Sequence, residues 1–135
     1  MSFSYSAVLV AIAIPIFTAQ LEKSRESTDV ANIRDYYAEI SVGLLDGSLN
    51  STSTTTTVTG GKTATATYTN GVLTSVAIPS VAIKQTDFSK WSIGNPDIAG
   101  VTVTTVPASA SVKVTYSFTE DTTSGKIYLS GIAFE

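Results

Sequence analysis

Residues 7–17 read AVLVAIAIPIF, an almost purely apolar run that contains one proline, Pro15. The chain then becomes abruptly charged between Glu22 and Asp29. Beyond this polar break it is amphipathic, because apolar residues recur at intervals of three and four. This spacing predicts one apolar helix face, made up of Val30, Ile33, Tyr37, Ile40 and Leu44.

Gly47 is the expected end of this helix, since glycine adopts the left-handed stop conformation without the steric penalty of a Cβ atom. We therefore predict one helix from Ala7 to Gly47. At about 1.5 Å per residue it would reach roughly 60 Å, which is longer than a globular domain of this size. Part of the helix should protrude, and the protruding part should be the apolar one.

The sequence AVLVAIAIPIFTAQLEKSRESTDVANIRDYYAEI, residues 7–40, closely resembles the N-terminal helix of type IV pilins, especially those of Gram-positive bacteria. The resemblance rests on an Ala/Ile/Val run broken by one proline, then a polar break, then an amphipathic helix. The rest of the chain resembles the family only in its general organisation, a helix followed by a Thr-rich antiparallel sheet. Anchored on Pro15, the chain starts inside the family's mature sequence, so we expect a shortened or altered N-terminus.

The resemblance implies a structural subunit of an extracellular, cell-surface filament. Subunits would reside in the inner or cytoplasmic membrane before assembly and would then polymerise with copies of themselves by burying their apolar helices. Adhesion, motility and DNA uptake are implied by the family alone. The residues expected to pack in the filament are Val8, Leu9, Val10, Ile12, Ile14, Pro15, Ile16 and Phe17. By the same resemblance Val8 to Ile14 would unwind on assembly, and a static kink at Pro15 is the alternative.

Two other functions are compatible with the sequence. The first is a pseudopilin or minor pilin of a type II secretion or competence system, which would form a short transient assembly. The second is a membrane-anchored β-sheet binding module that uses Trp91 as an aromatic platform. For Trp91 itself we favour a hydrophobic plug that closes one end of the sheet, because tryptophan is usually largely buried.

The polar break divides the chain into a protruding part, residues 1–29, and a globular part, residues 30–135. We expect the break to be a solvated helix face with ion pairs Glu22–Arg25 and Arg25–Asp29 at helical spacing. Each such pair contributes only about 0.3–0.5 kcal/mol.

Composition excludes several classes of function. The 135 residues fit one domain plus a helical extension, and a net charge of −3 with scattered Lys and Arg gives no strong nucleic-acid signal. The chain has no Cys and no His, so disulfides, thiol or imidazole chemistry and the usual zinc sites are excluded. We therefore expect no enzymatic activity, cofactor or metal. The apolar run of residues 7–17 is also shorter than the roughly 20 residues of a transmembrane helix.

The segment after the helix is rich in Ser and Thr. Ser51 to Thr59 lacks apolar alternation and is expected to be a loop or an edge strand. Asn50-Ser51-Thr52 is a glycosylation sequon, although simple Thr-rich β structure is the favoured interpretation. Asn70-Gly71 predicts a hairpin between strands Lys62–Thr69 and Val72–Ile78, with Pro79 ending the second.

Three more strands are predicted, at Val101–Val106, Ser111–Phe118 and Lys126–Phe134. Ser111–Phe118 alternates between apolar and polar residues, which indicates one packed and one solvated face. The apolar helix stripe and this packed face each need a partner. We therefore predict an α+β fold, with the long helix on a four- or five-stranded, mainly antiparallel sheet.

Overall fold

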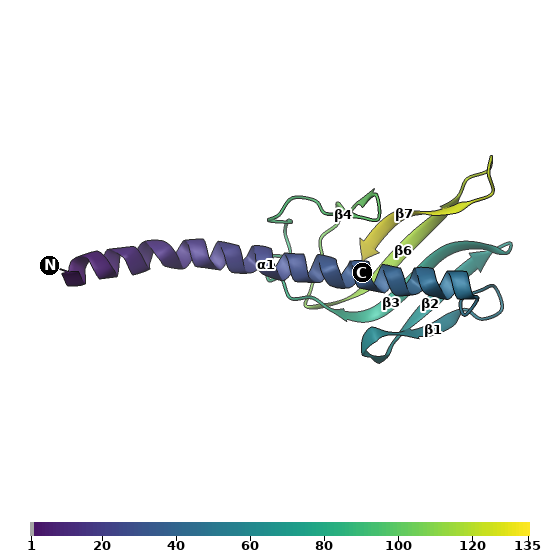
Figure 1. Cartoon of the computed structure of the whole chain (residues 1–135), viewed down its shortest axis with the longest axis horizontal. Coiled ribbons are helices and arrows are strands. Elements are labelled where there is room, and N and C mark those ends of the chain that lie inside the picture. Colours follow the sequence, from purple (N-terminus) through teal and green to yellow (C-terminus); the bar gives the residue numbers. More distant parts are fainter. Residues whose placement is uncertain (1) are drawn as a thin grey trace.

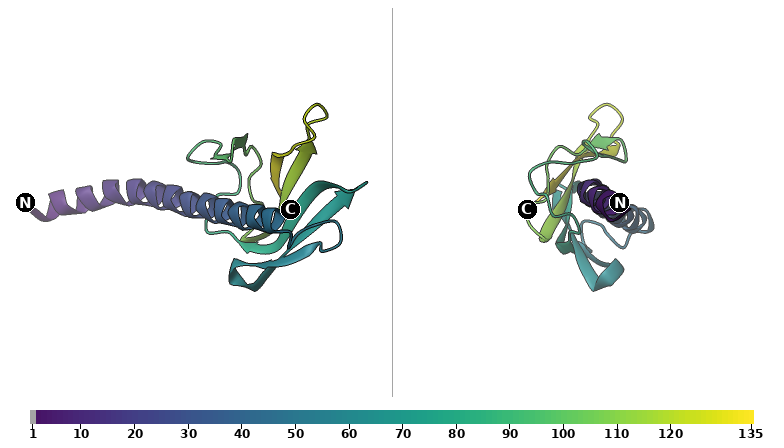
Figure 2. Two further views of the ribbon diagram at one scale, coloured as in Figure 1. Left: turned by 45° about the vertical axis from the view of Figure 1, so that its right-hand side comes forward. Right: turned by 90° about the vertical axis from the view of Figure 1, so that its left-hand side faces the viewer.

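One long helix lies across a five-stranded sheet and extends well beyond it (Figure 1). The computed structural model describes residues 2–135, with the helical backbone alone for residues 2–18 and side chains from Ala19 onward. Helix α1 spans Ser2–Asp46 and runs unbroken through Pro15. It thus begins five residues before the expected start at Ala7, and its N-terminal part projects from the domain (Figure 2).

The helix ends where the sequence predicts. Gly47 has a φ of 82°, the left-handed conformation that glycine adopts most readily. Hydrogen bonds from the residues that follow cap the C-terminal end of the helix. The Leu49 N–H donates to the Gly43 carbonyl at 2.9 Å, and the Ser48 N–H donates to Asp46 Oδ1 at 2.8 Å.

The sheet confirms the predicted α+β class, with five strands in the order β1-β2-β3-β6-β7 and every neighbouring pair antiparallel. Within Ser51 to Thr59 the structure contains both expected forms, a loop over residues 51–54 and the edge strand β1 after it. The β2–β3 hairpin turns on Asn70 and Gly71, whose φ angles are 53° and 78°. The strands are β1 (Thr55–Val58), β2 (Lys62–Thr69), β3 (Val72–Ala82), β6 (Ser111–Glu120) and β7 (Ile127–Phe134), and a 3-10 turn at Thr59–Gly61 joins β1 to β2.

The prediction that Pro79 ends its strand is wrong, since β3 continues to Ala82. Pairing of β3 with β2 ends at Ala77, so the N–H that proline lacks is not needed on that side. On the β6 side the register shifts between Ile78 and Val81, and Ser80 takes a φ of 56° there. The proline is accommodated in a local irregularity between two paired stretches.

The predicted strand Val101–Val106 is also mostly wrong. Only Val101–Thr102 is extended and paired, as β5, with β4 at Asp97–Ile98. The next N–H, that of Val103, donates to the Pro96 carbonyl at 2.8 Å. Because loop groups satisfy this backbone, the segment needs no strand partner.

The core lies between α1 and one face of the sheet. Val30, Ile33 and Ile40 are buried in it, while Tyr37 and Leu44 are partly buried and pack against it. Tyr116 of β6 ties the two layers together, because its hydroxyl donates to the Ile33 carbonyl at 2.6 Å. Its ring centroid lies 6.0 Å from that of Tyr37. Burial raises the pKa of the Tyr116 phenol far above its ordinary value of 10.0.

Trp91 closes the core near β7. Only 6% of it is exposed, its Nε1–H donates to the Thr105 carbonyl at 2.8 Å, and its ring centroid lies 6.1 Å from that of Phe134. This confirms the plug interpretation. It leaves no free tryptophan face on which a ligand could stack.

Candidate functional site

The projecting part of α1 carries the residues expected to pack in a filament. Its backbone is helical, but the side chains of Val8, Leu9, Val10, Ile12, Ile14, Pro15, Ile16 and Phe17 lie outside the part that the structure describes. The sequence contains no charged side chain before Glu22. Among the described residues, no helix combines the length and apolar character that a membrane crossing requires.

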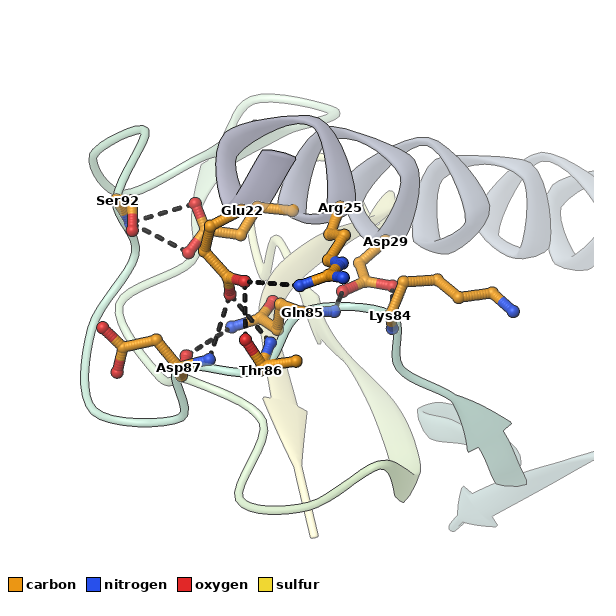
Figure 3. A network of polar contacts seen from close by, with 9 residues as sticks. Glu22, Arg25, Asp29, Lys84, Gln85, Thr86, Asp87 and Ser92 are labelled. Atoms are coloured by element: carbon orange, nitrogen blue, oxygen red, sulfur yellow. Dashed lines mark hydrogen bonds and ion pairs between the residues drawn. The ribbon is translucent and has the colours of Figure 1, made fainter. Parts of the chain in front are cut away.

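Three carboxylates fasten this helix to the domain. Glu22, Glu26 and Asp29 follow one another at intervals of four and three, which places them on one helix face. All three accept hydrogen bonds from the loop that connects β3 to β4, residues 83–96, and Figure 3 shows those of Glu22 and Asp29. We call this set of contacts the carboxylate junction.

Asp29 accepts two backbone hydrogen bonds, from the Lys84 N–H at 2.7 Å and the Gln85 N–H at 2.9 Å. The residue is 1% exposed. Burial raises the pKa of its carboxyl group and outweighs the two N–H donors, which act in the opposite direction. Asp29 is thus a charge held in the interior by backbone amides.

Glu22 binds the next turn of the loop. Its Oε1 accepts the N–H groups of Thr86 at 2.8 Å and Asp87 at 3.0 Å, and its Oε2 accepts the Thr86 hydroxyl at 2.8 Å. Arg25 lies 3.6 Å away on the same helix. Burial alone would raise the pKa of Glu22, but these hydrogen bonds together outweigh it and lower the pKa below its ordinary value of 4.5.

Glu26 is fully buried, with 0% exposure. Both of its oxygens accept the Ser92 N–H, at 2.9 and 3.0 Å, and Oε2 also accepts the Ile93 N–H at 3.2 Å. A buried carboxylate is tolerated only when donors replace the water that it loses. Here the donors are N–H groups of a loop that has no sheet partner. The carboxylate therefore receives the donors that it needs, and the loop N–H groups receive an acceptor.

The carboxylate junction corrects two expectations. The polar break is not solvated on all sides, because its carboxylate face is buried at Glu26 and Asp29. The helix also meets the domain at Glu22, about two turns before the division expected after residue 29. Of the two expected ion pairs, Glu22–Arg25 is confirmed; among the described residues Asp29 instead binds loop amides. The missed signal is that Glu22, Glu26 and Asp29 continue the helical spacing of Ile33 and Ile40.

The opposite face of this helical segment is exposed and carries the small residues Ser24, Ser27, Thr28, Ala31 and Ala38 together with one charged residue, Asp35. The Ser27 hydroxyl donates to the Lys23 carbonyl at 2.9 Å, and the Thr28 hydroxyl donates to the Ser24 carbonyl at 3.0 Å. Small side chains let a second helix approach closely. Because both hydroxyl groups already donate to helix carbonyls, such a contact would not leave them without hydrogen-bond acceptors.

Asn50 lies in the turn after α1 and is half-buried. Its Nδ2–H donates to the Gly47 carbonyl at 2.6 Å, while its Oδ1 accepts the Thr52 N–H at 2.8 Å and the Thr52 hydroxyl at 2.7 Å. The sequon thus organises its own turn. A glycan attached at Nδ2 would replace one of the two N–H groups of this amide and leave the Oδ1 acceptor in place.

Comparison with known proteins adds no assignment to this geometry. The described residues contain no group of three or more His, Cys, Asp or Glu that could hold a metal ion. No protein family, no curated protein and no solved structure matches the chain.

Proposed function

We propose that this protein is the structural subunit of an extracellular filament of the type IV pilus kind, assembled by burial of its N-terminal helices. One observation carries the proposal. Helix α1 projects from the domain, and the projecting segment holds the apolar run of residues 7–17 and no charged residue before Glu22. A segment of this kind is stable only where something removes it from water.

Packing among copies of the same helix supplies that environment. Apolar burial contributes about 25 cal/mol for each Å² removed from water, so mutual burial of these runs is a large driving force. The carboxylate junction supports the proposal in a second way. It fastens helix to domain through loop amides, so every subunit offers the same relative placement of helix and sheet, as a repeating assembly requires.

The exposed face of α1 between residues 24 and 38 follows the apolar run along the same helix. Its small residues, including Ser24, Thr28 and Ala31, are compatible with close helix packing beyond the apolar run. Residence in the membrane before assembly and display on the cell surface belong to the proposal through the resemblance to pilins. A pseudopilin or minor pilin would use the same helix, and the length and abundance of the assemblies would distinguish it.

The test is negative-stain microscopy of the purified full chain and of Ile12→Asp. The unmodified chain should form thin filaments. Ile12→Asp should form none and should keep the unfolding temperature of the unmodified chain, because residue 12 lies in the projecting part of α1. Burial of an unpaired carboxylate within a helix bundle is strongly unfavourable.

Thr63→Asp is the matched control, since it adds the same charge at an exposed position of β2. This variant should assemble normally. Normal filaments from Ile12→Asp would rule out burial of the helices as the basis of assembly. Uniformly monomeric particles from the unmodified chain would rule out assembly by this chain.

A further inference from the structure

The last turns of α1, the β2–β3 turn and the β6–β7 hairpin lie at the end of the molecule opposite to the projecting helix (Figure 1). An apolar groove is lined by residues of these elements. It has a volume of about 590 Å³ and lies between the last turns of α1, the β2–β3 turn and the β6–β7 hairpin. Leu49, Leu73 and Leu129 contribute buried side chains to it. Phe118 and Tyr68 contribute partly buried aromatic rings.

The groove is apolar at its rim as well as in its depth. Leu45 is 88% exposed and Ile127 is 44% exposed, and both line it. Large apolar residues gathered at one exposed site indicate an interaction surface.

The chemistry of the lining restricts the occupant. None of the described residues that line the groove is charged, and its polar members are hydroxyl, amide and glycine backbone groups such as those of Ser41, Asn50, Ser51 and Gly71. A charged peptide or a nucleic acid would find no counter-charge here. An uncharged apolar segment would leave no ion unpaired.

The same chain contains such a segment, and it cannot reach its own groove. Ile12 and Leu45 lie on one continuous helix, and at about 1.5 Å per residue they are roughly 50 Å apart. The segment of a second copy has no such restriction. Since the donor segment and the groove lie at opposite ends of the molecule, the contact would be head-to-tail and could repeat without limit.

We propose that the groove accepts part of the Ala7–Phe17 run of a second copy of this chain. This inference rests on the proposed function and deepens it, because it assigns the acceptor surface in the neighbouring subunit. The apolar run would then be shared between two environments, with one side packed on other helices and one side seated in the groove. Longitudinal contacts between subunits would thereby involve the sheet domain as well as the helices.

Cysteine cross-linking tests the contact directly, because the chain contains no cysteine of its own. Ser51 lines the groove and is exposed, so Ser51→Cys places a thiol at the rim without disturbing the core. It is combined in turn with Ala7→Cys, Ala11→Cys or Ala13→Cys. After mild oxidation of assembled filaments, at least one combination should give a ladder of dimers, trimers and longer chains.

Two controls define the outcome. Ser51→Cys alone should give no ladder, and Thr63→Cys on the exposed face of β2, combined with the same alanine positions, should give none either. Filaments that assemble normally without a ladder from any Ser51 combination would overturn the groove contact and leave the proposed function intact. Absence of filaments from the unmodified chain would overturn the proposed function itself.

Leu45→Glu is an independent variant, because a residue that is 88% exposed contributes little to the fold of the monomer. Its unfolding temperature should match that of the unmodified chain, while the protein concentration needed for filaments should rise. Thr63→Glu should change neither quantity. An unchanged assembly threshold for Leu45→Glu would count against the groove as an acceptor.

Discussion

At the scale of single residues, the carboxylate junction shows why the helix needs acids where it enters the domain. The loop from Lys84 to Ile93 has few backbone partners of its own, and its amides must be satisfied. Acidic side chains at helical spacing supply six oxygens along one line. Lys or Arg at these positions could not accept hydrogen bonds from the loop N–H groups, because their side chains carry only donors.

Glu26 provides the sharpest test of this account. Glu26→Ala would remove the acceptor of the Ser92 and Ile93 N–H groups at a position where the glutamate side chain itself is fully buried. Each unsatisfied buried group costs about 1–3 kcal/mol, so the free energy of unfolding should fall by at least that amount. Urea denaturation of the unmodified and variant chains measures the difference.

Glu39→Ala is the matched control. Glu39 also accepts a backbone N–H and a hydroxyl, both from Thr59, but the site is exposed. Water can replace the lost acceptor there, so a loss below about 1 kcal/mol is expected. An equal loss for both variants would show that burial does not determine the contribution of Glu26.

At the scale of elements, the β2–β3 hairpin depends on the conformation of its turn. Gly71 has a φ of 78°, and a Cβ atom added there would have no neighbour within 4 Å. The effect of Gly71→Ala should therefore come from the backbone alone, at about 1–2 kcal/mol of destabilisation. Thermal unfolding should show a lowered midpoint.

Gly131→Ala in β7 is the corresponding control. Its added Cβ atom would lie 3.9 Å from Ser117 Cβ, which is ordinary contact, and its φ is not in the left-handed range. Because glycine within a strand is entropically unfavourable, this variant should be neutral or slightly more stable. A larger loss at Gly131 than at Gly71 would contradict the role assigned to the turn.

The elements also show how far the sequence can be interpreted. Alternation predicted β2 and β6, and helical spacing predicted the core face of α1, because burial enforces these periods directly. Sequence-based prediction failed in two places. At Val103 a loop carbonyl takes the place of a strand partner, and at Pro79 a register shift lets the strand continue past the proline. The carboxylate junction was missed because a local pattern of charges is compatible with solvent and with burial, and only the distant loop distinguishes the two.

At the scale of the whole molecule, acid should weaken the fold. Hydrogen bonds to the ionised form lower the pKa of Glu22 below its ordinary value of 4.5, although burial opposes them. Bonds from a Ser or Thr two residues later do the same for three other acids, Asp46, Asp87 and Asp121. Groups of this kind stabilise the folded state at pH values above their ordinary pKa, and that stability is lost as the pH falls through the lowered pKa.

Asp29 acts in the opposite direction, because burial raises its pKa above 3.8. Relative to the unfolded chain, folding shifts the ionisation of Asp29 toward the neutral form, so its contribution is greatest at low pH and is lost as the pH rises through the raised pKa. One group with a raised pKa therefore opposes four with lowered values. The free energy of unfolding should be smaller at about pH 3 than at about pH 7, as urea titrations at the two values would measure. Glu22→Gln should reduce this difference, since it removes one of the four acids, and equal stability at both pH values would contradict the balance argued here.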